Sequence, residues 1–232
     1  MPRPTGLWRA TPLAVRVATY RRLSATLRER SEGLAALVTE EMGKTLAAAR
    51  AEVEKCAAPI DWIAEHGPAF LADEPAPVDG DDQVYVSYLP IGSILAVMPW
   101  NFPLWQVIRA SGPIMLSGNG FILKHAANVM GSAYALQDVY EAAGFPVGLF
   151  ANLNVENETV AQVIEDPRVA AVTLTGSMRA GSAVASTAGR ALKKTLLELG
   201  GADAFIVLAD ANIDLAVNAA TDTFLWPMAG IE

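Results

Sequence analysis

Cysteine and histidine are scarce in this sequence, which has one cysteine, Cys56, and two histidines, His66 and His125. A lone cysteine excludes an internal disulfide and fits a reducing compartment, so we expect a cytoplasmic protein. Two histidines without cysteine pairs do not form a zinc-binding pattern, so we predict no metal site. Two glutamates near Cys56 would raise the pKa of its thiol, and we interpret Cys56 as a packing residue rather than a nucleophile.

Basic residues and long apolar runs are also few. The 17 lysines and arginines are outnumbered by 25 acidic residues, which gives a net charge of -8. This charge argues against nucleic acid as the main partner, and the densest basic cluster, residues 16–30, is predicted to be a solvated helix face. No apolar run is long enough to span a membrane, and the N-terminus lacks the apolar core of a secretory signal. We therefore expect neither a nucleic acid nor a membrane as partner.

Hydrophobic residues make up 52% of the sequence, enough to bury a core, and their spacing changes along the chain. Residues 1–71 are predicted to form an N-terminal helical segment, because apolar residues recur there at three- and four-residue steps. Gly33 and Gly43 are the predicted breaks, which give two or three helices. Residues 72–90 are predicted to be a linker rich in Pro, Gly and Asp, followed by an exposed edge strand at 83–89 where the residues alternate.

From residue 91 onward, apolar strands alternate with helices of crossover length. Strands that are apolar on both faces and alternate with helices indicate a parallel sheet covered on both sides. We therefore predict an α/β fold with a Rossmann-like doubly wound parallel sheet over residues 91–224, which binds ligands at the carboxyl ends of its strands. The predicted strands are 91–98, 120–123, 149–152, 169–174 and 204–208, and the predicted helices are 104–116, 131–143, 159–164, 180–192 and 213–223.

Asn101 lies in the segment MPWNFP, residues 98–103, where the first strand of this domain ends. Two prolines fix the backbone on either side, and Trp100 and Phe102 enclose the amide. An amide held in this way could donate a hydrogen bond to a developing oxyanion. It could equally cap the helix that follows. The residues alone leave both interpretations open.

Glu198 lies in the segment LLELGG, residues 196–201. A carboxylate flanked by leucines should resist ionisation, which would raise its pKa toward the range that suits a general base. The alternative is a surface glutamate at the end of a strand or helix, and the burial habits of glutamate favour that alternative when the residue is taken alone.

Two further segments follow predicted strands. Lys124 is a lone charge that ends an apolar strand, and by burial habits alone it would extend to solvent. Thr175, Gly176 and Ser177 end another strand and begin a helix that runs through Gly181. A glycine turn and a helix N-terminus can hold a phosphate, but neither GxGxxG nor the Gly-Lys pair of a P-loop is present. Spacing alone therefore favours an ordinary strand-to-helix turn.

The strings PWNFPL at 99–104, TGS at 175–177 and ELGG at 198–201 resemble the NAD(P)-dependent aldehyde dehydrogenase family. EMGK at 41–44 and LKHAANVMG at 123–131 are most similar to its succinate-semialdehyde dehydrogenase branch. The resemblance implies that Asn101 holds the oxyanion and Glu198 activates the deacylating water. It also implies that Arg109, two helical turns after Asn101, binds the distal carboxylate of the substrate beside Trp105, although a surface arginine is the alternative. The residues that the resemblance assigns to the NAD or NADP site are Met98, Pro99, Trp100, Lys124, Ala127, Thr175, Gly176, Ser177, Gly181 and Leu199.

The resemblance implies that an intact family member oxidises an aldehyde, here succinate semialdehyde, to the acid with NAD or NADP through a thioester. Many NAD-preferring relatives have a glutamate where this chain has Ala127, so the choice of cofactor stays open. Family members are homo-oligomers, and residues 72–90 would form the oligomerisation arm. The nucleophilic cysteine of the family does not occur before Glu232, and residues 225–232 do not match the expected continuation. We therefore expect a fragment that is inactive alone; the alternative is a stand-alone nucleotide-binding or interaction module without catalysis.

Overall fold

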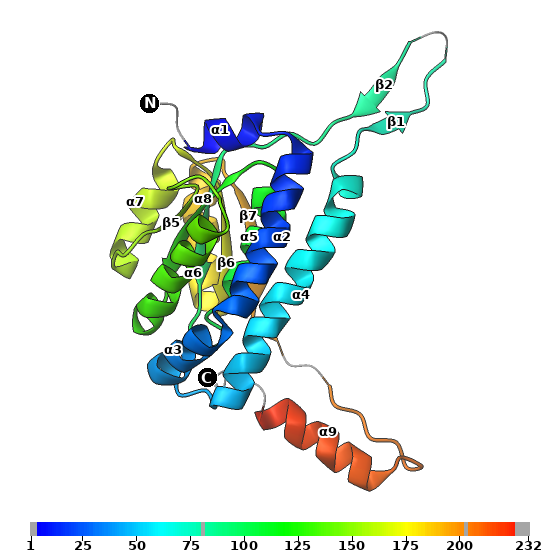
Figure 1. Ribbon diagram of the computed structural model, residues 1–232, viewed down its shortest axis with the longest axis vertical. Helices are drawn as coiled ribbons and strands as arrows, with labels where there is room; N and C mark the ends of the chain where they lie inside the picture. The colour runs from blue at the N-terminus through cyan, green and yellow to red at the C-terminus, as the bar shows by residue number, and fades with distance from the viewer. Residues whose placement is uncertain (1–3, 80–81, 202–203, 226–232) are drawn as a thin grey trace.

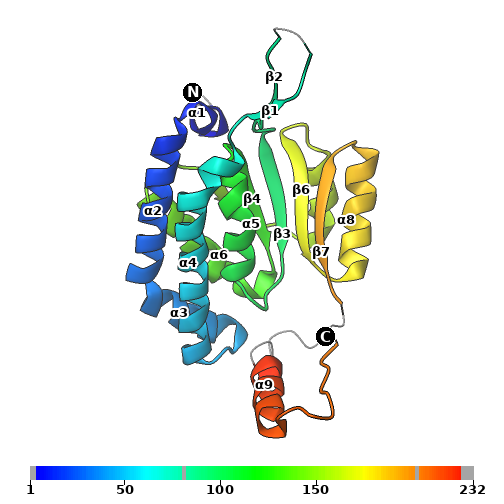
Figure 2. The same ribbon diagram turned by 90° about the vertical axis from the view of Figure 1, so that its right-hand side faces the viewer.

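A five-stranded parallel sheet lies at the centre of the computed structural model, which describes residues 4–79, 82–201 and 204–225 (Figure 2). Its strand order is β5-β4-β3-β6-β7, and the chain passes from β3 outward to β5 before it crosses to β6 and β7. The strand order therefore reverses beside β3, which is where open parallel sheets bind ligands. The strands are β3 (Ser93–Met98), β4 (Gly120–His125), β5 (Phe150–Asn152), β6 (Val169–Gly176) and β7 (Lys194–Leu199).

Helices cover both faces of this sheet (Figures 1 and 2). One face packs against α5 (Trp105–Leu116) and α6 (Met130–Ala142), and the other against α7 (Val160–Glu165) and α8 (Met178–Arg190). Three N-terminal helices, α2 (Leu13–Glu29), α3 (Ser31–Met42) and α4 (Leu46–Phe70), form a further layer on α5 and α6. This arrangement confirms the predicted doubly wound α/β fold. Within the described ranges, no helix is both long and apolar enough to cross a membrane.

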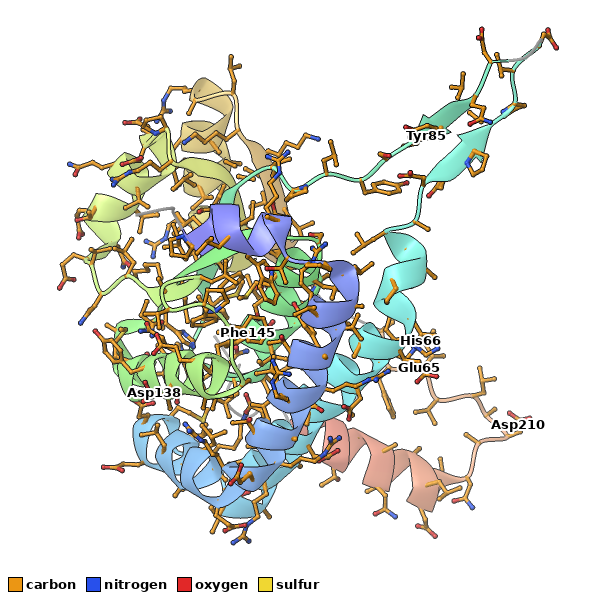
Figure 3. The ribbon with its side chains drawn as sticks, turned by 45° about the horizontal axis from the view of Figure 1, so that its top comes forward. Glu65, His66, Tyr85, Asp138, Phe145 and Asp210 are labelled. Atoms are coloured by element: carbon orange, nitrogen blue, oxygen red, sulfur yellow. The ribbon has the colours of Figure 1, made fainter. Side chains whose placement is uncertain are left out.

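Aromatic rings join the N-terminal layer to the sheet. Phe145, which follows α6, packs against Trp8, Tyr20 and Tyr140 with ring centroids 5.0, 5.5 and 4.9 Å away (Figure 3). Tyr140 in turn stacks on Phe150 of β5, with 4.5 Å between their centroids. All five side chains are buried, so the helices and the sheet share one hydrophobic core. The short helix α1 (Pro4–Ala10) carries Trp8 and adds a helix to the two or three predicted for residues 1–71.

Two carboxylates from the N-terminal layer bind the first turns of α5 and α6. Glu52 of α4 accepts hydrogen bonds from the backbone N–H groups of Leu104 and Trp105 at 2.9 and 3.0 Å. Glu41 of α3 accepts from the N–H groups of Gly131 and Ser132 at 2.6 and 2.8 Å. Free N–H groups and the helix dipole both favour an anion at a helix N-terminus, so these contacts stabilise α5 and α6.

Two arginines of α2 bind the opposite ends of the same helices. Arg16 donates to the carbonyl oxygen of Leu116 at 2.5 Å, and Arg22 donates to that of Ala143 at 2.9 Å. The prediction that residues 16–30 form a solvated face is therefore wrong for Arg16, which is half-buried, whereas Arg22 is exposed although it binds the end of α6. Amphipathic spacing identifies the outer side of α2, but it does not show that long side chains at its margin reach the ends of neighbouring helices.

The N-terminal boundaries differ in part from the prediction. The break between α2 and α3 lies at Arg30, and Gly33 is inside α3; Gly43 does end α3, with φ of 77°. The predicted linker contains a strand, β1 (Glu74–Ala76), which pairs antiparallel with β2 (Val84–Val86). The predicted edge strand at 83–89 is thus shorter and part of a hairpin. This hairpin projects from the body of the molecule and carries Tyr85 (Figure 3).

The C-terminal part of the prediction has two errors. The apolar residues 204–208 form no strand, and their side chains are exposed. An apolar run forms a strand only where a neighbouring strand offers hydrogen bonds, and none among the described residues pairs with it. Conversely, β7 was not predicted. Helix α9 (Ile213–Leu225) lies away from the sheet (Figure 1), and residues 226–232 of the predicted atypical tail lie outside the described residues.

Close packing of α4 on α5 depends on Gly67, and this generates a stability prediction. A Cβ at Gly67 would lie 2.3 Å from Cδ2 of the buried Leu116, whereas a Cβ at Gly33 of α3 would meet nothing within 4 Å. We expect Gly67→Ala to destabilise the chain by about 1–2 kcal/mol through overpacking. The matched control Gly33→Ala should stabilise it by about 0.5–1 kcal/mol, because alanine favours a helix.

The measurement is the midpoint of urea unfolding for both variants. Equal stabilisation by the two substitutions would show that Leu116 moves aside without cost and that the α4–α5 contact is not tight.

Candidate active site

The carboxyl ends of β3, β6 and β7 bring the three predicted motif segments to one edge of the sheet. Val97 pairs with Leu174, and Leu174 pairs with Leu197. The next pair in that register is Thr175 with Glu198, and Asn101 lies in the loop that follows β3. The asparagine, the TGS turn and the glutamate therefore lie at the same edge, beside the reversal of strand order.

Asn101 does not cap the following helix. Helix α5 begins at Trp105 with Leu104 as its N-cap, and Glu52 rather than Asn101 binds its first N–H groups. The side-chain Oδ1 of Asn101 instead accepts from the N–H of Phe102 at 3.1 Å. Among the described residues, no acceptor is bonded to its Nδ2. The amide is therefore oriented through its oxygen, and its nitrogen is left as a donor.

Glu198 forms an ion pair with Arg109 of α5. The distance from Arg109 Nη1 to Glu198 Oε2 is 3.4 Å, and Arg109 Nη2 donates to Thr175 Oγ1 at 3.3 Å. The side chain of Glu198 is 49% exposed. The prediction that flanking leucines shield this carboxylate is therefore wrong in this structure. Because β7 is an edge strand, its Leu196 and Leu199 are exposed as well, and they do not remove water from Glu198.

Arg109 and Trp105 line an apolar groove between α4 and α5. Its volume is about 510 Å³, and its walls include Trp62 and Ile108. Arg109 is the one charged side chain among the described residues that line it. With 37% of its side chain exposed and two partners bound, Arg109 is not a freely solvated surface residue. A groove of this kind suits a short aliphatic chain that ends in an anion.

Lys124 is the penultimate residue of β4, and only 7% of it is exposed. Its Nζ donates to Asn157 Oδ1 at 2.7 Å, so the side chain does not extend into solvent as the alternative interpretation expected. Burial lowers the pKa of Lys124, while the charges of Glu156 and Glu158 oppose that shift. The amine is thus held at the carboxyl edge of the sheet.

Thr175 and Gly176 end β6, and Ser177 is the N-cap of α8. The Oγ of Ser177 accepts from the N–H of Ala180 at 3.3 Å. A Cβ at Gly181 would lie 2.5 Å from Leu199 Cδ2, so the absence of a side chain at Gly181 allows Leu199 to contact the first turn of α8. The N-terminus of this 13-residue helix therefore opens at the same edge as Asn101 and Glu198, with backbone donors available to an anion.

The remaining predicted cofactor residues differ in exposure. The side chain of Met98 belongs to the core, and the residue is only 3% exposed. Met98 can therefore contact a ligand only through its backbone atoms. Pro99 and Trp100 are half-buried in the loop that contains Asn101. Ala127 is exposed at the start of a single 3-10 turn after β4.

His125 supports the Asn101 loop, a role that the sequence did not reveal. Its Nδ1 accepts from the N–H of Ala126 at 2.9 Å, which leaves Nε2 to donate to the carbonyl oxygen of Pro103 at 2.9 Å. Burial lowers the pKa of His125, which favours this neutral form. No group of histidine, cysteine, aspartate or glutamate side chains within the described residues could hold a metal ion.

Comparison with known proteins identifies the family. The sequence profile of the Aldehyde dehydrogenase family matches residues 3–228. The chain is 54% identical over 213 residues to the succinate semialdehyde dehydrogenase [NAD(P)+] Sad of Escherichia coli, and this match covers 92% of the chain and 46% of that protein. It is 48% identical over 215 residues to succinate-semialdehyde dehydrogenase [NADP(+)] 1 of Mycobacterium tuberculosis, covering 92% of the chain and 47% of that protein.

Solved structures agree with this result. A succinic semialdehyde dehydrogenase from Streptococcus pyogenes, in complex with NADP+, matches with a TM-score of 0.86 and 40% identity over 90% of the chain and 46% of that structure. A succinate-semialdehyde dehydrogenase from Burkholderia pseudomallei matches with a TM-score of 0.89 and 32% identity over 95% of the chain and 46% of that structure. The chain spans about half the length of the curated relatives that it matches. With the motifs, the fold and these relatives in agreement, the chain belongs to the aldehyde dehydrogenase family.

Proposed function

We propose that this chain forms the part of an NAD(P)-dependent aldehyde dehydrogenase that binds the cofactor, the oxyanion and the deacylating water. We propose succinate semialdehyde as the substrate and the dicarboxylic acid as the product. The observation that carries this proposal is the position of Arg109, which contacts Thr175 of β6 and Glu198 of β7. Through Arg109, a groove for an acidic substrate adjoins both the predicted cofactor turn and the predicted base.

The donor groups at the carboxyl edge fit NAD or NADP. The N-terminus of α8, with its backbone N–H groups and its positive dipole, suits a pyrophosphate. The amine of Lys124 suits the hydroxyl groups of the adenosine ribose, because it is held at the end of β4. When bound, the nicotinamide supplies hydride-accepting chemistry. Ala127 places no carboxylate near the ribose, so the site carries no group at that position that would repel the additional phosphate of NADP.

The chain's own residues would act on the aldehyde as follows. Arg109 orients the substrate through its distal carboxylate, because a guanidinium can bind a carboxylate with two parallel hydrogen bonds. When a thiolate adds to the aldehyde carbon, the carbonyl oxygen becomes negative and accepts a hydrogen bond from Asn101 Nδ2. After the carbon is oxidised to a thioester, Glu198 takes a proton from water, and the resulting hydroxide releases the acid and restores the thiolate.

Cys56 does not fit the role of that thiolate. It is fully buried inside α4, and burial raises the pKa of its thiol well above the ordinary value, with the charge of Glu52 acting in the same direction. A nucleophilic cysteine needs access and a lowered thiol pKa. We therefore propose that the nucleophile belongs to a part of the enzyme beyond these 232 residues, and that the chain alone does not turn over substrate.

We also propose that the hairpin of β1 and β2 acts as the oligomerisation arm of a homo-oligomer. Val84, Tyr85 and Val86 are 47%, 58% and 50% exposed, which is unusual for three consecutive apolar residues in a strand.

We further propose that the chain is divided into a helical segment at 1–71, this arm at 72–90 and a cofactor domain at 91–224. A reducing compartment such as the cytoplasm suits the one unpaired cysteine.

The inert state of Cys56 can be measured directly. We expect iodoacetamide at pH 8 to label Cys56 at least about 100-fold more slowly in the native chain than in urea, because the buried thiol is neither accessible nor ionised. The measurement is the rate of mass increase by mass spectrometry. Labelling of the native chain at the unfolded rate would show that Cys56 is accessible and would reopen the question of the nucleophile.

Cofactor binding should depend on Lys124. We expect calorimetric titration to detect binding of NAD or NADP, and Lys124→Ala to weaken it by about tenfold, equivalent to about 1.4 kcal/mol, because the bond to the ribose is lost. The matched control is Lys194→Ala, which removes the same charge at the start of β7, the opposite end of the sheet, and should leave the affinity unchanged. No binding of either nucleotide by the wild-type chain would contradict the proposed function, and cofactor reduction on adding aldehyde would contradict its proposed inactivity.

The substrate proposal can be tested in a chimera in which residues 1–224 replace the matching part of the Escherichia coli relative. We expect Arg109→Ala to lower kcat/KM for succinate semialdehyde by about 100-fold, because a charge-assisted bidentate contact is lost. Butanal has no distal carboxylate and serves as the control substrate, and its kcat/KM should change little. An equal loss for both aldehydes would assign Arg109 a structural role and remove the basis for an acidic substrate.

A further inference from the structure

Lys44 and Glu52 form an ion pair inside the protein, behind the Asn101 loop. The exposed fractions of their side chains are 5% and 1%, and Lys44 Nζ donates directly to Glu52 Oε2. Lys44 follows the left-handed turn at Gly43, and Glu52 lies in α4. The two residues therefore come from the N-terminal helices and not from the sheet.

The pair holds both ends of the segment 101–105. Lys44 Nζ donates to the carbonyl oxygen of Asn101 at 3.2 Å and lies 3.8 Å from the centre of the Phe102 ring. Glu52 Oε1 accepts from the N–H groups of Leu104 and Trp105, as described above. A cation thus fixes the start of the segment and an anion fixes its end, while each neutralises the other.

Capping of α5 does not by itself explain why Lys44 is buried. Glu41 binds the N-terminus of α6 in the same way, and no lysine or arginine among the described residues pairs with it. Burying an ion pair also adds little net stability, because the cost of removing two charges from water offsets their attraction. The contact that distinguishes Lys44 is its hydrogen bond to Asn101, so its role is to be sought in the geometry of that loop.

We propose that Lys44 and Glu52 are positioning residues for Asn101. By fixing the carbonyl of Asn101 and the backbone three and four residues after it, they hold its Oδ1 against the N–H of Phe102 and keep Nδ2 available in one orientation. Preorganised donors stabilise an oxyanion because they need not reorient as charge develops. The value of this positioning for catalysis rests on the proposed function, whereas the positioning itself does not.

The test uses nuclear magnetic resonance of the ¹⁵N-labelled 232-residue chain without cofactor. We expect Lys44→Met and Glu52→Gln each to shift or double the side-chain amide signals of Asn101. Exchange of the Phe102 backbone amide should become at least about tenfold faster, because its acceptor is no longer held in place. The control is Glu41→Gln, which weakens the equivalent carboxylate at α6 and should lower the thermal midpoint while leaving the Asn101 signals unchanged.

A second variant separates loss of the Asn101 geometry from a general loss of stability. The double variant Lys44→Met/Glu52→Gln buries no unpaired charge, so it remains measurable if a single variant fails to fold. In the double variant the Asn101 signals should still move. Unchanged Asn101 signals and unchanged Phe102 exchange in the folded variants would overturn the proposal. A wild-type chain that binds neither NAD nor NADP would refute the proposed function but leave this result intact.

Discussion

The two crossover helices α5 and α6 depend on charges that they do not carry themselves. Their N-termini are bound by Glu52 and Glu41, and their C-termini by Arg16 and Arg22. Each contact satisfies backbone groups that a helix leaves without partners, and each has the sign that the helix dipole favours. The N-terminal layer thus fixes the position of α5, and α5 in turn carries Trp105 and Arg109 at the candidate active site.

This dependence connects packing to chemistry through Glu52. The same carboxylate ends the Asn101 loop, begins α5 and pairs with Lys44. Displacement of α4 would therefore alter the asparagine, the groove and the arginine together. His125 adds a second support from β4, because its ring bonds the carbonyl oxygen of Pro103 in the same loop. The loop between β3 and α5 is consequently held from both the helical layer and the sheet.

Most of the sheet could be predicted because its inner strands are apolar on both faces, which gives a continuous signal between helices of amphipathic spacing. The strand β7 escaped prediction because it is an edge strand that begins with Lys194 and Thr195 and is largely exposed. The run at 204–208 had the stronger apolar signal but forms no strand among the described residues. Strand formation depends on available neighbours, and a local pattern does not contain that information.

The sequence identifies the motif residues of the candidate site, but it does not identify the residues that hold them in place. Asn101, Glu198 and the TGS turn stand out because each interrupts an apolar stretch or follows a strand. Lys44 and Glu52 resemble ordinary helix-surface charges in the sequence, since the groups that they bind lie more than 50 positions away. The shielding expected for Glu198 was wrong for a similar reason, because neighbours in sequence do not determine what covers a side chain on an edge strand.

Ala127 illustrates how unequally the fold constrains its residues. It is exposed on a single turn, whereas Lys124 three positions earlier is buried. Surface substitutions of this kind cost little folding free energy. Under the proposed function, single substitutions at this turn would therefore change selectivity between the two nicotinamide coenzymes while the architecture around it stays fixed.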